Sequence, residues 1–94
     1  MIEIRFENEK NRAVAYDDKE LIGECTFSVS SEIWEIDHTY VDNKYRGQGV
    51  AQRLVKAIVD EARVKNKKIT PLCSFAKREF DRVAEYRELL QVDI

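Results

Sequence analysis

A glycine-rich segment, Arg46 to Ala51, has the residue types of an anion-binding turn. Gly47 and Gly49 lack a Cβ, so the backbone can adopt angles that other residues avoid, and its N–H groups can approach a ligand closely. The amphipathic segment that follows predicts a helix, whose first N–H groups are unpaired and lie at the positive end of the helix dipole. This combination favours a negatively charged ligand, usually a phosphate compound.

Two further side chains, Cys73 and His38, could take part in covalent or acid–base chemistry. A cysteine becomes a nucleophile when a neighbouring base or a helix N-terminus lowers its pKa, and we expect a helix from Ser74 onward. The alternative is that Cys73 is a small buried apolar residue, as free cysteines usually are. A histidine suits a general base near neutral pH, but a position packed or half-exposed in a sheet explains His38 equally well.

The composition restricts the class of protein. The 94 residues are enough for one domain, residues 1–94, without disulfides or metals to hold its core. A net charge of −2 argues against nucleic acid as the main partner, which would require a basic excess. No apolar run reaches membrane-spanning length, and the first residues do not resemble a signal peptide.

Cysteine and histidine usage indicates a cytoplasmic protein without a metal site. Cys25 and Cys73 are expected to be free thiols, because the chain shows no secretory segment. Cys25 alternates with apolar residues and is expected in the core. With a single histidine, and with no cysteine pair at ligand spacing, a zinc site is not expected.

The first half of the chain has the alternation of β-strands joined by short turns, which predicts an antiparallel meander. In the third strand the apolar residues share one face, and in the fourth strand His38 is expected on one face with Trp34, Ile36 and Tyr40. The strands are expected near Ile2–Phe6, Ala13–Tyr16, Leu21–Val29 and Ile33–Val41, and the third strand's apolar face comprises Leu21, Gly23, Cys25, Phe27 and Val29.

After Asn43 the apolar residues recur at every fourth position, which predicts a helix from Val50 to Ala62. A short strand, Lys68–Cys73, follows, and Pro71 is expected either to keep part of it at the edge of the sheet or to interrupt its pairing. A second helical region runs from Phe75 to Leu90, with a break near Val83. The strand–helix–strand unit should make its two strands parallel, and ligands gather at the carboxyl ends of such strands. The glycine turn and Cys73 are therefore predicted neighbours.

Two common phosphate-binding motifs do not fit the turn. A kinase-type P-loop has Lys and then Ser or Thr after its last glycine, whereas Gly49 is followed by Val50 and Ala51. A dinucleotide fingerprint would place Gln52 where close packing between helix and strand requires Gly or Ala. The turn therefore belongs to neither class.

The segment Arg46 to Ala51 instead matches the Arg/Gln-x-x-Gly-x-Gly/Ala signature of the GNAT N-acetyltransferases. The chain resembles the small, trimmed GNAT-like proteins over roughly residues 20 to 80, with His38-Thr39-Tyr40-Val41 on the long strand and Pro71-Leu72-Cys73 after the next. The resemblance implies an α/β (α+β) fold of reduced GNAT type: a mixed, mostly antiparallel sheet with a parallel strand–helix–strand unit and a C-terminal helical region.

The resemblance also implies acetyl-CoA, or coenzyme A, as the cofactor. The backbone of Gln48, Gly49, Val50 and Ala51, with Arg46 and Gly47 beside it, would bind the pyrophosphate. Tyr40 and Val41 would flank the pantetheine arm, which adds to the sheet like an extra strand. Lys44 and Arg53 are further candidates for phosphate contacts, and Phe75 could border the adenine or the pantetheine.

The chain departs from larger GNAT enzymes in two respects. They insert a pair of helices between their first two strands, but Glu7 to Arg12 is too short for one. Many also place a tyrosine in the final helix as proton donor to the leaving thiolate. Here Asp81 falls nearest that position, and Tyr86 lies a turn or more beyond it.

The leading hypothesis is an acetyl-CoA-dependent N-acetyltransferase that acts on an unidentified amine, either a small molecule or a protein. Cys73 would be a covalent relay and His38 its base. A CoA-binding or acyl-CoA-sensing module without catalysis is the alternative, favoured by the missing helix pair and tyrosine. A third class, an interaction domain without a ligand, would not bind CoA. The sequence does not indicate the acceptor or the oligomeric state.

Overall fold

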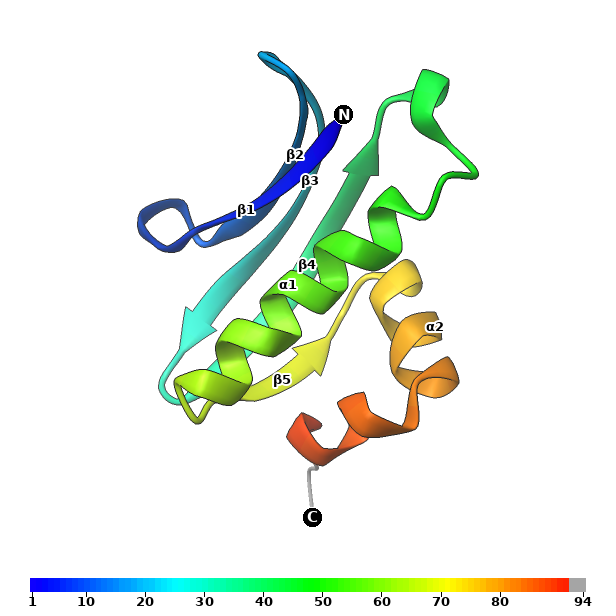
Figure 1. Ribbon diagram of the computed structural model, residues 1–94. Helices are drawn as coiled ribbons and strands as arrows, with labels where there is room; N and C mark the ends of the chain where they lie inside the picture. Colours follow the sequence, from blue (N-terminus) through cyan, green and yellow to red (C-terminus); the bar gives the residue numbers. More distant parts are fainter. Residues whose placement is uncertain (92–94) are drawn as a thin grey trace.

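Five strands form one mixed sheet, in which they follow one another in chain order (Figure 1). A computed structural model describes residues 1–91. The first four strands pair antiparallel, as their short turns predict. The fourth and fifth strands, which precede and follow the long helix in the chain, pair parallel. The strands are β1 (Ile2–Glu7), β2 (Arg12–Asp17), β3 (Glu20–Ser30), β4 (Ile33–Val41) and β5 (Lys68–Pro71).

The helices pack against one face of this sheet (Figure 1). Helix α1 (Val50–Val64) crosses the sheet, and α2 (Ser74–Arg82) lies beside it next to β5. Three short 3-10 helices complete the described elements: η1 (Asn8–Lys10), η2 (Asn43–Tyr45) and η3 (Ala84–Leu89). The predicted break between the two C-terminal helical parts is confirmed, because Val83 has an extended backbone between α2 and η3.

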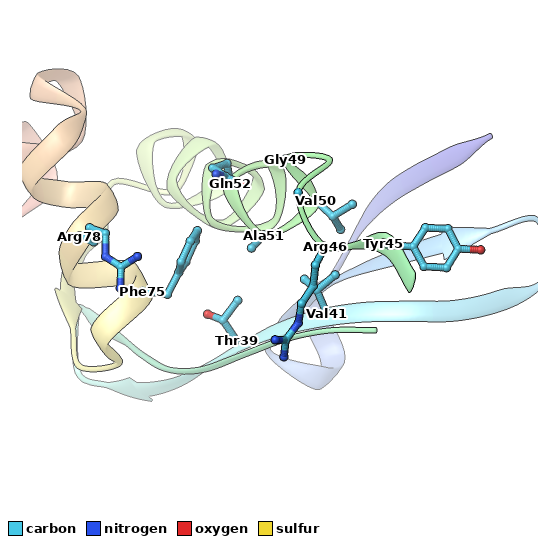
Figure 2. Close-up of a pocket in the computed structure, with 11 residues that line it drawn as sticks. Thr39, Val41, Tyr45, Arg46, Gly49, Val50, Ala51, Gln52, Phe75 and Arg78 are labelled. Carbon is cyan, nitrogen blue, oxygen red and sulfur yellow. The ribbon is translucent and has the colours of Figure 1, made fainter. Parts of the chain in front are cut away.

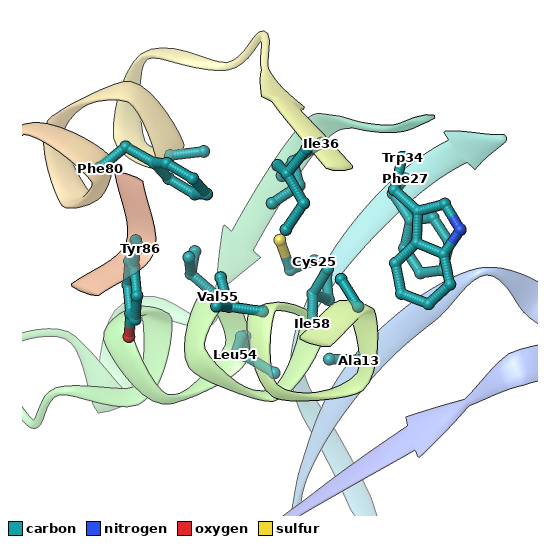
Figure 3. Packing of buried hydrophobic residues seen from close by; sticks show 14 of the residues in the cluster. Ala13, Cys25, Phe27, Trp34, Ile36, Leu54, Val55, Ile58, Phe80 and Tyr86 are labelled. Carbon is teal, nitrogen blue, oxygen red and sulfur yellow. The ribbon is translucent and has the colours of Figure 1, made fainter. Parts of the chain in front are cut away.

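The core lies between the sheet and α1 (Figure 3). The predicted apolar stripe of α1 is confirmed: Leu54 and Ile58 are fully buried, and burying a side chain of this size stabilises a fold by about 1.5–3 kcal/mol. At one end of the core the rings of Phe27 and Trp34 stack at 4.3 Å. At the other end Phe80 and Tyr86 extend the core from α2 and η3 (Figure 3).

A bulge between β2 and β3 changes which residues of β3 are buried. Tyr16 pairs with Leu21 and Ala15 with Gly23, so Ile22 is an extra residue. Ile22 is fully buried, while Leu21 is 37% exposed, which corrects the expectation that Leu21 belongs to the buried face. Gly23, Cys25 and Phe27 keep the expected alternation, but Val29, near the end of the strand, is exposed.

The final strand is short, as Pro71 predicts. Its last pair with β4 is Ile36 with Pro71, and the chain then turns into α2. Leu90 returns to the edge of β5, where it forms a bridge with Ile69. Among the described residues no helix is both long and apolar enough to cross a membrane. The cytoplasmic location stays a prediction.

Candidate cofactor site

A cavity of about 500 Å³ opens between the end of β4, the glycine turn and the first half of α2 (Figure 2). Its floor comes from β4 and one wall from the turn with the start of α1, while α2 provides the opposite wall. The residues that line it are Thr39, Val41, Tyr45, Arg46, Gly47, Gly49, Val50, Ala51, Gln52, Phe75 and Arg78.

The floor of the cavity is a strand edge without a neighbouring strand. The N–H groups of Leu72 and Cys73 both donate to the carbonyl of Ile36, at 2.8 and 3.1 Å. Beyond Ile36 the pairing of β4 with β5 ends, and the chain leaves the sheet for α2. Residues 37–41 therefore keep their outer edge free of any described strand, so an extended ligand can add there.

The turn has the backbone geometry that its glycines predict. Gly47 and Gly49 have φ angles of +83° and +79°, in the left-handed region that favours glycine. Gly49 is the N-cap of α1 and has no side chain with which to cap it. The first N–H groups of α1 therefore have no side-chain cap within the described chain, and they lie at the cavity, where the positive end of a helix dipole favours an anion.

Two arginines beside the cavity carry unpaired charge. Neither Arg46, in the turn, nor Arg78, on α2, forms an ion pair or a side-chain hydrogen bond with any of residues 1–91. Two cations on opposite walls of the cavity, with the N-terminus of α1 beside Arg46, make the cavity electropositive, although the chain has a net negative charge. Lys44 and Arg53, the other cations considered, do not line the cavity.

Tyr45 anchors the turn to the end of β2. Its hydroxyl donates to Asp17 at 2.6 Å, and Asp17 also pairs with the N-terminal ammonium at 3.1 Å. The hydrogen bond to Asp17 raises the pKa of Tyr45 to about 12, and the bond from Tyr45 lowers the pKa of Asp17. Tyr45 thus holds the turn in place and is poorly suited to release a proton near neutral pH.

Residues 6–89 match the model of the GCN5-related N-acetyltransferases. The chain belongs to this GNAT family. A GCN5-like protein from Staphylococcus aureus has 34% sequence identity and a TM-score of 0.75, with 98% of this chain and 90% of that one covered. GNAT acetyltransferases typically use acetyl-CoA and act on amine acceptors.

Other GNAT structures share the fold at lower identity. The ribosomal-protein-S18-alanine N-acetyltransferase of Escherichia coli is 13% identical, with a TM-score of 0.65 over 81% of this chain and 53% of that one. N-acetylglutamate synthase from Neisseria gonorrhoeae, complexed with coenzyme A and N-acetylglutamate, is 19% identical, with a TM-score of 0.66. The match covers 86% of this chain and 21% of the synthase. A comparison with curated proteins gave no match.

A second bulge, in β4, changes which residues of this GNAT chain face the cavity. Thr26 pairs with His38 and Phe27 with Ile36, so Asp37 is an extra residue in β4. The side chains of β4 therefore change faces after Ile36. Thr39 and Val41 line the cavity, whereas His38 and Tyr40 are exposed and do not. The expectation that His38 shares a face with Trp34 and Ile36 is wrong for this reason.

The predicted cofactor residues are only partly gathered at the cavity. Val41, Arg46, Gly47, Gly49, Val50 and Ala51 line it. Gln48 does not line it, and Tyr40 has 47% of its surface exposed elsewhere, so only their backbones remain candidates. Four further lining residues were not assigned to the site from the sequence: Tyr45 and Gln52, which flank the glycine motif, Arg78, and Thr39, which lies within the segment that carries the resemblance. Phe75 and Arg78 are three positions apart on a helix. This spacing is the one sequence pattern that could have placed both side chains on the same helix face.

Cys73 lies at the edge of the site, as the sheet topology predicts. It is the N-cap of α2, and its sulfur accepts a hydrogen bond from the N–H of Ala76 at 3.4 Å. The hydroxyl of Thr39, a cavity residue, lies 3.4 Å from the same sulfur. Cys73 is half-buried and does not itself line the cavity. Its sulfur therefore lies beside the free edge of β4, at the N-terminus of α2.

Neither of the two residues considered for the position of a proton-donating tyrosine lies at the cavity. Tyr86 is buried against Phe80, with ring centroids 5.5 Å apart, and burial raises its pKa. Neither Tyr86 nor the exposed Asp81 lines the cavity. Tyr45 is the tyrosine that does, and its hydroxyl is already bonded to Asp17.

The two cysteines differ in their expected reactivity. Cys25 is a core residue, as predicted, and burial raises the pKa of its thiol to about 12. With iodoacetamide at about pH 8, native protein should gain one alkyl group, on Cys73, and unfolded protein two. Peptide mapping by mass spectrometry checks this. Equal labelling of Cys25 and Cys73 in native protein would show that Cys25 is accessible.

The raised pKa of Cys25 makes the free energy of unfolding depend on pH, with a defined sign. Because the pKa of Cys25 is higher in the folded than in the unfolded state, the native protein keeps this proton to higher pH. The stability contribution is present below about pH 9 and is lost as the pH rises toward about 12. The free energy of unfolding should therefore fall less over this range in Cys25→Ala than in wild type.

Proposed function

We propose that this chain binds acetyl-CoA in the cavity and transfers the acetyl group to an amine. The observation that carries the proposal is the free edge of β4, which leads from the glycine turn to the sulfur of Cys73. At the glycine turn this edge offers N–H donors for the pyrophosphate, and at Cys73 it offers a nucleophile for the thioester. A linear phosphate-containing thioester fits this order of groups.

In this proposal the turn binds the pyrophosphate through the N–H groups at the start of α1 and the guanidinium of Arg46. The pantetheine arm pairs with the outer edge of β4 near Thr39 and Val41, as an added strand would. Strand N–H groups near Tyr40 and Val41 then polarise the thioester carbonyl, since they are fixed donors that need no reorganisation during the reaction.

We assign Cys73 the role of covalent relay. Its thiolate attacks the thioester carbonyl, an S–C bond forms, and the C–S bond to CoA breaks, so that CoA leaves as a thiolate and takes up a proton. The acceptor amine then attacks acetyl-Cys73, an N–C bond forms, and the cysteine thiolate is released while the amine loses its proton. His38 is given no step, because it lies on the other face of the sheet from the cavity.

A titration followed by a turnover assay tests the proposal. At a hundred times its Kd, CoA should stabilise the fold by about 2.7 kcal/mol, a rise in Tm of about 14 °C for a chain of this size. With acetyl-CoA and a panel of small and peptide amines, free CoA thiol should then accumulate. Binding without thiol release would favour the non-catalytic module, and the absence of any shift with CoA would contradict both functions.

A further inference from the structure

The outer edge of β1 is a part of the sheet that the cofactor site does not use. β1 pairs with β2 alone among the described strands, so the backbone N–H and C=O groups on its outer side have no strand partner there. At the other end of the sheet, Leu90 bridges Ile69 of β5, and the free edge of β4 leads into the cavity. An unpaired strand edge is a template for pairing with another strand.

β1 lacks most of the features by which sheet edges avoid such pairing. Its six residues pair with β2 in one uninterrupted register, from Ile2 with Asp17 to Glu7 with Arg12, without a bulge. The strand contains neither proline nor lysine. Very short strands, bulges, prolines and lysines are typical of protected edges. The intact edge of β1 is therefore suited to a partner strand.

The side chains of β1 define what that partner strand must present. Ile2, Ile4 and Phe6 are partly buried against the core. Glu3 and Arg5 lie on the opposite face, away from the helices, because successive side chains of a strand alternate between faces. They form an exposed ion pair, with 3.1 Å between Oε2 and Nε. A partner must offer charges of the opposite sign on one face and apolar side chains on the other.

A second copy of β1 meets these requirements in one register. In an antiparallel pair about a two-fold axis at Ile4, each Glu3 faces Arg5 of the other copy. On the helix-bearing face, Ile4 faces its own copy, and each Ile2 faces Phe6 of the other copy. Opposite charges and apolar pairs directly across two strands stabilise a sheet. The edge is therefore complementary to itself in both charge and hydrophobicity.

The neighbouring registers are unfavourable. An axis at Glu3 places this carboxylate opposite its own copy, and an axis at Arg5 places two guanidinium groups together. Like charges directly opposite are destabilising. An axis between two residues brings charged side chains opposite apolar ones, because a slip of one residue exchanges the faces of a strand. Charge and hydrophobicity thus select the register centred on Ile4.

We propose that the edge of β1 is a homodimer interface, through which two copies pair antiparallel about Ile4 and join their sheets into one. This inference does not depend on the proposed function, because β1 and β5 are opposite edges of the sheet and the cavity lies toward β5 (Figure 1). One strand edge is smaller than a standard protein interface, so the expected dissociation constant is about 10–100 µM.

Sedimentation equilibrium at up to about 1 mM protein tests the dimer. The average mass of wild type should rise with concentration from that of one chain toward that of two. Glu3→Arg puts guanidinium groups at positions 3 and 5, and Arg5→Glu puts carboxylates at both, so each variant should dimerise at least about tenfold more weakly. Glu85→Arg makes the same change of charge on η3, toward the β5 edge, and should dimerise as wild type does.

Mixing the two β1 variants separates the interface from the stability of each chain. Both variants carry like charges within one chain, but across the two-fold axis each guanidinium meets a carboxylate. The mixture should therefore form heterodimers with about the affinity of wild type. Wild type that stays monomeric at about 1 mM would overturn the proposal. Dimers that persist in both variants would place the interface on another surface, and a mixture without heterodimers would overturn the register.

Discussion

Gly49→Val is expected to lower the affinity for CoA by about a hundredfold, which corresponds to about 2.7 kcal/mol. At φ +79° a β-branched residue is strained, and left-handed backbone costs an L-residue about 1–2 kcal/mol. The space around the new Cβ is open, since the nearest atom, Oε1 of Gln52, is 4.0 Å away. The turn should relax to another backbone conformation and take its N–H groups away from the pyrophosphate. Isothermal titration with CoA measures the change.

Asn66→Val is the matched control. Asn66 follows α1 at its other end, is exposed, and has a φ of +61°, so valine there meets the same backbone strain far from the turn. This variant should lose comparable stability and bind CoA as wild type does. Unchanged affinity in Gly49→Val would put the cofactor elsewhere, and loss of binding in both variants would point to a general effect of destabilisation.

Cys73→Ala should abolish the acetylated protein that forms when wild type is mixed with acetyl-CoA. The relay requires a sulfur nucleophile at this position, and the other cysteine, Cys25, is buried with its thiol pKa raised to about 12. Intact-mass spectrometry before and after addition of an amine measures both steps: wild type should gain one acetyl group and then lose it to the acceptor.

A second variant separates chemistry from structure. Alanine removes the N-cap acceptor of α2 and should cost about 1 kcal/mol of stability, whereas Cys73→Ser retains an acceptor for the N–H of Ala76. Both should lack the thioester adduct, but only Cys73→Ala should be less stable in urea. Wild type without an acetyl adduct, together with full transfer activity in Cys73→Ala, would rule out the relay in favour of direct transfer.

The elements of the fold and the position of the turn follow from local pattern. Two glycines before a four-residue apolar repeat specify a left-handed turn and an amphipathic helix, because both depend only on residues adjacent in the chain. Short turns between alternating segments similarly specify an antiparallel meander, and a helix between two strands makes them parallel. The nearness of Cys73 to the cavity follows from that topology.

Tertiary structure decided which side chains line the cavity. One extra residue in β4, Asp37, reverses the alternation, so that Thr39 and Val41 face the cavity in place of His38 and Tyr40. Asp37 accepts hydrogen bonds from Thr26 and Ser28 of β3, at 2.6 and 2.8 Å. The bulge therefore depends on how β3 and β4 pair. The alternation of residues within β4 alone does not reveal it.

The sequence by itself thus determined a glycine turn at the start of a helix, a mixed sheet and a thiol at the same sheet end. Tertiary structure alone decided that Thr39 contacts Cys73 and that Arg78 faces Arg46 across the cavity. The physical reason is that both arrangements join elements distant in the chain. Their geometry is set by how β4, β5 and α2 pack around a shared core, where a shift of one residue moves a side chain to the opposite face.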